Sequence, residues 1–215
     1  MRNVFTTKTR SEINYSGKQN FLFFVPSWLL LTIFVFGCAP GRYEGLTGGV
    51  QASPEEAIQN ARHYLKTRPD WDIDCSHFVL ACYHSREMAV FLNARKYHHN
   101  LVYDLNYYLT KKKTRRARAA DIRPGDILIF NFTYDINRDG RIDAKDVFTH
   151  AGIVEKFLDG AVYYIDAAGS RKPPRLHRRA FSLFGEGHNE AVARDPATGR
   201  KILHRETFYA AYAPP

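Results

Sequence analysis

Cys75 and His150 are the two residues of this sequence whose types could together do nucleophilic chemistry. Cys75 follows Asp74 where an apolar helical pattern begins, and the residues of that pattern are Cys75, Phe78, Val79 and Cys82. Cysteine attacks as a thiolate, and the ordinary thiol pKa of about 8.5 must fall for work near neutral pH. A helix N-terminus favours the thiolate because its unpaired N–H groups attract an anion. The same N–H groups, at residues 75–76, could hold an acyl oxyanion.

The base for such a thiol must come from elsewhere in the chain, and His150 is the leading candidate among nine histidines. It heads a predicted strand, 151–157, whose first residues are small enough for a backbone or a substrate to come close. Asp159-Gly160 predicts a hairpin to a second strand, 161–166. The hairpin brings the far ends of both strands to one edge. Asp166 could therefore reach and orient the imidazole ring, as in other catalytic triads.

Residues 135–146 match the pattern of a calcium loop of the EF-hand or dockerin type, with Asp instead of Glu at the last position. Ca²⁺ takes about six to eight oxygen ligands. The predicted ligands are Asp135, Asn137, Asp139, the carbonyl of Arg141, Asp143 and Asp146. Gly140 permits the sharp turn that such loops need. A polar turn without metal is the alternative. Because Asp146 lies four residues before His150, we expect bound Ca²⁺ to hold the His150 strand in place.

The elements that must position these residues follow from capping and periodicity signals. Ser53 as N-cap, Pro54 at the first helical position and Glu56 predict a helix start. A second helix is expected from Cys75, and residues 86–95 continue helically. Strands are predicted at 126–132, 151–157, 161–166 and 208–212, whereas 96–120 and 171–205 read as polar or loop-rich. Helices first and antiparallel strands later predict an α+β fold.

Residues 21–37 form an uncharged apolar run after a basic stretch, which is typical of a secretory segment or a short membrane helix. The run ends at Gly37-Cys38, and a small residue before Cys at this place is similar to a bacterial lipobox, in which the Cys is lipidated. An uncleaved anchor is the alternative. We therefore expect an anchor segment at 1–38, a Gly-rich tether at 39–52 and one domain at 53–215. Either interpretation puts the domain in the cell envelope, at the outer membrane or in the periplasm.

The formal net charge is +9, from 31 Lys and Arg against 22 Asp and Glu. A basic surface favours anionic partners. The export segment argues against nucleic acid and leaves anionic lipid or cell-wall polymer. The basic run 111–118 is either a solvated loop or a docking site for such a polymer.

Cys75 also has a less specific interpretation, as a small core residue on a buried helix face. Cys82 shares that face without an accompanying motif, and we expect it to be core. The two cysteines are about 10 Å apart along a helix, which is too far for a disulfide. An exported protein would then keep Cys75 unpaired, which favours a chemical role. Asp74 could cap the helix or position substrate.

The order of motifs resembles the NlpC-type family of papain-like cell-wall peptidases. The matching segments are DCSHFV (74–79), RPGDILIF (123–130), HAGIV (150–154) and VYYIDAAG (162–169). The resemblance implies a papain-like fold, with N-terminal helices packed on an antiparallel sheet, and an acyl-transfer hydrolase that cuts peptidoglycan stem peptides. It maps Cys75 as nucleophile, His150 as base and Asp166 as orienting residue, with Ser76 and Asp74 beside the nucleophile. Tyr64 is the nearby candidate for an upstream tyrosine that often assists the oxyanion.

Together these patterns predict an exported, monomeric cysteine peptidase or amidase at the cell envelope. Its substrate would be peptidoglycan or another peptide, and its cofactor a structural Ca²⁺, with no organic cofactor. Two rivals stay open. One is a related amidase or transglutaminase-like acyl transferase on the same fold, and the other is a non-catalytic, calcium-dependent adhesion or scaffold lipoprotein.

Overall fold

The computed structural model describes residues 50–94, 100–168, 175–185 and 187–215. The predicted anchor segment, its Cys38 and most of the predicted tether lie outside the described residues. No helix among the described residues is long and apolar enough to cross a membrane. Ala52, at the end of the predicted tether, is buried and donates its N–H to the carbonyl of Tyr83 at 2.8 Å. The folded domain therefore includes at least this residue of the predicted tether.

Helix α1 (Pro54–Thr67) begins as its capping signals predict. The Ser53 hydroxyl accepts a hydrogen bond from the Glu56 N–H at 3.2 Å, and the Glu56 carboxylate accepts one from the Ser53 N–H at 2.8 Å. This reciprocal pair satisfies two of the N–H groups that a helix start leaves free. The capping box is therefore confirmed.

In the described part of the chain, three further α-helices and one short 3-10 helix follow before the sheet begins: α2 (Cys75–Tyr83), α3 (Arg86–Ala94), α4 (Leu101–Lys111) and η2 (Ala119–Asp121). Residue 84 ends α2 in the left-handed conformation, so residues 86–94 form a separate helix. The prediction of a polar segment at 96–120 missed α4. Its inward face, Val102, Leu105, Tyr108 and Leu109, has helical spacing, but neighbouring Tyr and charged residues obscured the pattern.

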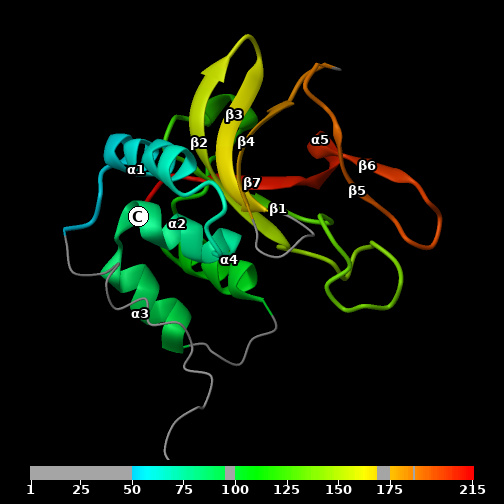
Figure 1. Ribbon diagram of the computed structural model, residues 1–215, viewed down its shortest axis with the longest axis horizontal. Coiled ribbons are helices and arrows are strands. Elements are labelled where there is room, and N and C mark those ends of the chain that lie inside the picture. The colour runs from blue at the N-terminus through cyan, green and yellow to red at the C-terminus, as the bar shows by residue number, and fades with distance from the viewer. Residues whose placement is uncertain (1–49, 95–99, 169–174, 186) are drawn as a thin grey trace, which may run out of the picture. The chain divides into compact units, whose positions relative to one another are not determined.

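The strands form a five-stranded antiparallel sheet in the order β4-β3-β2-β1-β7. Their bounds are β1 (Ile127–Phe130), β2 (His150–Leu158), β3 (Ala161–Ala168), β4 (Arg175–Ser182) and β7 (Phe208–Tyr212). A separate pair, β5 (Ala191–Arg194) and β6 (Lys201–Leu203), and the short helix α5 (His204–Thr207) precede β7. The expectation of an α+β fold with an antiparallel sheet is confirmed, and Figure 1 shows α1 and α2 beside β2 and β3.

Each face of the sheet carries its own core. On one face, sheet residues such as Ile129, Ile153 and Ile165 pack with the buried residues of the helices. On the other face, the buried cluster comprises Ile122, Leu128, Phe130, Val154, Val162, Tyr164, Phe181 and Ala211. Burial of both faces makes the central strands nearly continuous apolar runs, which is why the sequence identified β1 and β3 readily.

The 171–205 segment was predicted as loop-rich, yet it contains β4, β5, β6 and α5. Strand β4 reads RLHRRAFS, and its charged residues hide the strand pattern. Two of them point to buried carboxylates: Arg178 lies 2.6 Å from Glu155, and Arg179 lies 3.0 Å from Asp166. Pairing with an acid on the neighbouring strand β3 and with another on β2, the next strand beyond it, therefore allows arginines where a sequence pattern predicts a solvated loop.

The Gly-Asp lead-in to β1 has a structural role. Gly125 has φ +86°, and a Cβ there would lie 2.5 Å from the Cβ of Pro54, so both conformation and space require glycine. Asp126 is fully buried and accepts two hydrogen bonds from the Arg116 guanidinium, at 2.6 and 2.8 Å. This motif therefore ties α1 and the basic run to the first strand.

Candidate active site

Cys75 is the first residue of α2, and Asp74 is its N-cap. The Asp74 carboxylate accepts hydrogen bonds from the N–H groups of Ser76 at 2.9 Å and His77 at 3.0 Å, and it also pairs with the His77 ring. Burial alone would raise the pKa of Asp74, but the bonds to His77 and Ser76 outweigh it and lower the pKa. Of the two roles predicted for Asp74, the geometry is that of a cap.

The capping bonds change which N–H groups could hold an oxyanion. The Ser76 N–H is already bonded to Asp74, so it is not free as the prediction for residues 75–76 requires. Within the described part of the chain, the Cys75 N–H has no hydrogen-bond acceptor. Of the two predicted donors, the Cys75 N–H is therefore the one available to a negatively charged oxygen.

His150 begins β2 and is paired across the sheet with Phe130. Its Nε2 lies 2.8 Å from Oδ2 of Asp166, and its side chain is only 12% exposed. Burial is the largest influence on its pKa and acts to lower it. The charge of Cys75 and the hydrogen bonds with Asp166 and Cys75 outweigh burial and raise the pKa to about 10. The imidazole is therefore protonated at neutral pH, in the electrostatic field of the Cys75 sulfur.

Asp166 is positioned by the register of β2 and β3. It is paired with Gly152, so His150 is its diagonal neighbour on the same face of the sheet. The carboxylate is fully buried, which on its own would raise its pKa. The hydrogen bond with His150, together with the charges of His150 and Arg179, lowers it. Asp166 is therefore ionised and fixes the ring through Nε2, which leaves Nδ1 as the atom that can face the thiol.

Cys75 and Cys82 differ as the sequence suggests. Cys82 is fully buried in the helix-side core, and burial raises the pKa of its thiol far above the ordinary value. Cys75 is partly exposed and packs at the margin of the same core. Neither is in a disulfide. The accessible thiol is thus the one beside the imidazole.

Gly152 makes room for neighbouring core atoms. A Cβ at this position would lie 2.6 Å from Cδ2 of Tyr164, whose ring is fully buried, and 3.2 Å from the backbone carbonyl oxygen of Ile165. This small residue therefore lets a core aromatic side chain and the backbone of β3 come close.

Tyr64 lies in an aromatic and basic environment. Its ring packs against Trp71, at a centroid distance of 4.9 Å, and below the Arg68 guanidinium. Burial is the main cause that raises its pKa, followed by the charge of Cys82. Its role in assisting the oxyanion stays a prediction.

Tyr134 is a neighbour of Cys75 that the sequence did not indicate. Burial raises its pKa, and the charges of Cys75 and Asp74 raise it further, so its hydroxyl shares the surroundings of the thiol. The preceding residue, Thr133, hydrogen-bonds to the Thr149 hydroxyl at 2.9 Å, directly before His150. No motif in the sequence marked this tyrosine, because only the fold of the 131–149 loop brings it here.

The calcium-loop residues form a compact turn held by their own backbone. Asp135 accepts hydrogen bonds from the N–H groups of Asp139 and Gly140 at 3.2 and 2.8 Å. Asp146 is buried and accepts from Ile136 and Asp143, both at 2.9 Å. Asn137, Arg141 and Asp143, the other predicted ligands, lie in the same turn. Gly140 has φ +84°, as the predicted sharp turn requires.

The donor chemistry of this loop suits Ca²⁺. No group of three or more His, Cys, Asp or Glu side chains in the described residues is arranged to hold a metal. The Lys145 ammonium lies 3.1 Å from the Asp139 carboxylate, where a cation would compete with it. Binding of Ca²⁺ to this loop stays a prediction.

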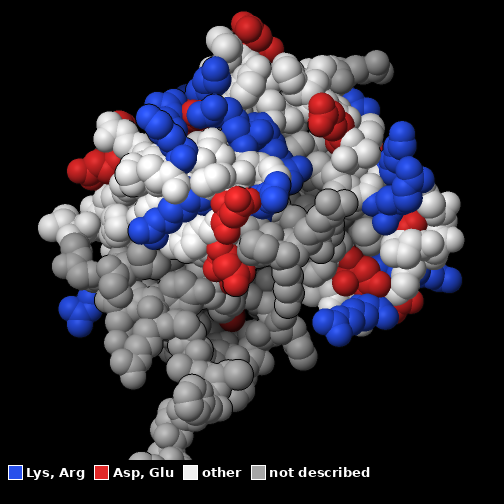
Figure 2. Space-filling model, in the orientation of Figure 1, with Lys and Arg blue, Asp and Glu red and all other residues white. Residues whose placement is uncertain are grey.

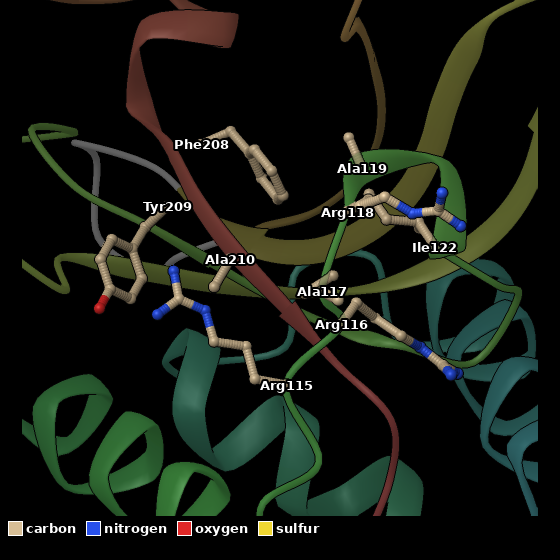
Figure 3. Close-up of a pocket in the computed structure, with 10 residues that line it drawn as sticks. Arg115, Arg116, Ala117, Arg118, Ala119, Ile122, Phe208, Tyr209 and Ala210 are labelled. Carbon is tan, nitrogen blue, oxygen red and sulfur yellow. The ribbon is translucent and has the colours of Figure 1, made fainter.

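The basic run 111–118 is neither wholly solvated nor free of structure. Lys111 ends α4, and the Arg116 N–H donates to the Ala211 carbonyl at 2.9 Å, beside edge strand β7. A cavity of about 320 Å³ lies there, bordered by residues 115–119, Ile122 and residues 208–211. Figure 3 shows Arg115 reaching toward Tyr209 and Arg118 beside Ala119 and Ile122. Cys75, His150 and Asp166 are not among the residues that line this cavity, so it is separate from the candidate site.

One face of the molecule is basic. Figure 2 shows Lys and Arg gathered over α1 and the neighbouring strands on this face. Arg62 on α1 and Arg178 on β4 both bond to the buried Glu155, at 2.7 and 2.6 Å, and are about half exposed. Part of the net positive charge is therefore fixed in place by a buried acid.

Comparison with models of known protein families gives no match for this chain. Searches among curated proteins and among solved structures also give no match.

Proposed function

We propose that this chain is an exported cysteine hydrolase of papain-like type that cleaves amide bonds in peptidoglycan stem peptides, anchored in the cell envelope. One observation carries the proposal: Cys75 at a helix start, His150 and Asp166 form one electrostatically coupled set. The pKa of His150 is raised to about 10 by the charge of Cys75 and by the bonds with Asp166 and Cys75, against the effect of burial. Strongly shifted groups of this kind concentrate at functional sites.

In the proposed acylation step the Cys75 thiolate attacks the carbonyl carbon of the scissile amide. A C–S bond forms, and the carbonyl electrons move onto oxygen, where the Cys75 N–H and the dipole of α2 stabilise the charge. The intermediate collapses with cleavage of the C–N bond. His150 gives its proton to the leaving amine, and a thioester on Cys75 remains.

In deacylation neutral His150 takes a proton from water, and the resulting hydroxide attacks the thioester. The C–S bond breaks, the acid product leaves, and the imidazolium–thiolate pair returns. Asp166 stays ionised throughout and keeps the ring oriented, because its bond to Nε2 leaves Nδ1 toward the sulfur.

Calcium has a structural part in this proposal. Asp135, Asn137, Asp139, the Arg141 carbonyl, Asp143 and Asp146 would hold it, and Ca²⁺ would supply only cross-linking of the loop. The loop is continuous with both Tyr134 and the β2 lead-in at Thr149, which are linked through Thr133. Ordering of the loop would therefore restrict the positions of Tyr134 and Thr149, which lie next to Cys75 and His150.

The experiment is digestion of purified sacculi, with mass analysis of the soluble fragments. The proposal expects peptides cut at a stem amide by the natural chain, and none with Cys75→Ala. The matched control is Cys82→Ala, which removes the other described thiol and leaves the site intact.

Two results favour the rivals. Intact muropeptides with one modified amide would indicate the amidase or transglutaminase-like activity. If no fragment is released and both thiols are alkylated equally slowly, the result would favour the calcium-dependent scaffold function.

A further inference from the structure

Asp166 has a second cationic partner besides His150. The Nε atom of Arg179 lies 3.0 Å from Oδ2 of Asp166 and 3.4 Å from Oδ1. Oδ2 is also the atom that His150 bonds at 2.8 Å. Asp166 is paired across the sheet with His177, so Arg179, two residues further along β4, is its diagonal neighbour on the same face. The sheet register therefore puts a permanent positive charge against the buried carboxylate.

His150 alone cannot keep the buried Asp166 carboxylate paired with a positive charge throughout the proposed reaction. In the proposed reaction His150 gives up its proton, and at that moment Asp166 would be a buried charge with a neutral partner, which is costly. An arginine keeps its charge at every pH at which proteins are folded, and its planar guanidinium fixes the direction of the bond. Arg179 can therefore keep Asp166 ionised and in place throughout the cycle.

No other group around Asp166 carries a permanent positive charge. Burial is the main cause that lowers the pKa of His204 to about 4, with the charge of Arg179 next, so His204 is neutral at physiological pH. Its ring bonds to the Tyr164 hydroxyl. His177 bonds to the Ala168 carbonyl at 2.9 Å, and its charge lowers the pKa of Asp166 less than the charge of Arg179 does. The charged and titratable groups that face the His150–Asp166 pair are Cys75, His177, Arg179, His204 and Tyr164.

We infer that Arg179 is a positioning residue for the proposed reaction: it holds Asp166 ionised and oriented, so that Asp166 can direct His150 at Cys75. The inference rests on the proposed function, because it acts through the proposed triad. Sequence motifs did not indicate Arg179, since it lies in a segment that reads as loop.

A cavity beside Arg179 makes the inference testable by chemical rescue. The cavity measures about 190 Å³ and is lined by residues 178–180, His188, residues 190–192 and His204. Arg179 is about one-third exposed there. Truncation of Arg179 should therefore open a space that a free guanidinium ion can reach from solvent.

The experiment measures alkylation of Cys75 by iodoacetamide as a function of pH, with the full chain purified in detergent and the site assigned by mass spectrometry. The variants are Arg179→Ala and Arg179→Lys. Arg178→Ala is the matched control, because Arg178 lines the same cavity but bonds to Glu155. Circular dichroism verifies that each variant is folded, and if Arg179→Ala is not, the Lys variant still carries the test.

With Arg179→Ala, burial should favour protonation of Asp166, and His150 loses its anionic partner. We expect alkylation below neutral pH to fall about tenfold, with the acid limb displaced to higher pH by about one unit. Guanidinium chloride, far below denaturing concentration, should restore the rate, and Lys should restore part of it. Arg178→Ala should follow the natural curve.

Curves for Arg179→Ala and Arg179→Lys that superimpose on the natural curve would overturn the inference. So would a uniform slowing at all pH values without rescue, which is what a merely structural residue would give. If the natural Cys75 is alkylated no faster than Cys82, the proposed function itself fails, and that result is visible before any variant is made.

Discussion

The imidazole of His150 and the carboxylate of Asp166 are joined by a 2.8 Å contact between Nε2 and Oδ2, and the carboxylate has no exposed surface. A charge–charge contact of this kind, sheltered from water, is stronger than a surface ion pair. It holds the ring by one nitrogen and leaves the other for the thiol. This pair therefore determines how activity should depend on Asp166 and on pH.

Asp166→Asn should lower kcat/KM by roughly 10²–10⁴-fold, because the ring loses its charged partner and its fixed tautomer. The pKa of His150 in the natural chain is raised to about 10, so His150 should stay protonated across neutral pH and kcat/KM should decline only near pH 10. Loss of the Asp166 charge lowers that pKa, so the alkaline limb should move to lower pH. The pH profile of kcat/KM measures this.

Asp159→Asn is the control for this substitution, since Asp159 lies in the exposed turn between β2 and β3. An unchanged alkaline limb in Asp166→Asn would contradict the role given to Asp166.

Gly152→Ala should destabilise the fold, because the new Cβ would lie 2.6 Å from a carbon of the buried Tyr164 ring. Overpacking of this kind costs about 1–3 kcal/mol. For a chain of this size that lowers Tm by about 2–4 °C per kcal/mol. Thermal unfolding followed by circular dichroism measures it.

Gly187→Ala is the matched control, since among the described residues a Cβ there would meet only the Ser182 hydroxyl, at an ordinary 3.5 Å. Equal Tm values for the two variants would show that Tyr164 yields easily, and the packing account of Gly152 would be abandoned.

Calcium at millimolar concentration should raise Tm, since extracellular-type loops bind at about 10⁻⁴–10⁻³ M. Removal by a chelator should lower Tm and, if the loop supports the β2 lead-in, kcat as well. The double variant Asp135→Asn with Asp139→Asn should abolish the Tm shift, whereas Asp121→Asn, outside the loop, should retain it. Identical melting curves with calcium and with chelator would leave the loop as a polar turn.

The sequence predicted best those elements whose signals are local. The capping box at Ser53 and Glu56, the helix start at Cys75 and the Asp159-Gly160 turn each depend on a few adjacent residues, and the structure contains all three. The turn residues have φ of +51° and +75°, as the hairpin signal requires.

Features that depend on distant partners were missed. Strand β4 carries Arg178 and Arg179 because Asp166 on β3 and Glu155 on β2 lie within reach of their side chains, and no local pattern contains that information. Tyr134 comes near Cys75 through the path of a long loop. Side-chain partners across the sheet, rather than periodicity, decide these positions.

The central claim is that His150 activates the Cys75 thiol, and the alkylation rate of Cys75 across pH tests it most directly. Cys82, fully buried in the same helix, is the internal control. The account predicts that Cys75 reacts much faster than Cys82, with a rate that stays high below pH 8 and falls sharply there in His150→Ala. Contradiction would come from equal slow rates for both cysteines, or from a Cys75 rate that His150→Ala leaves unchanged.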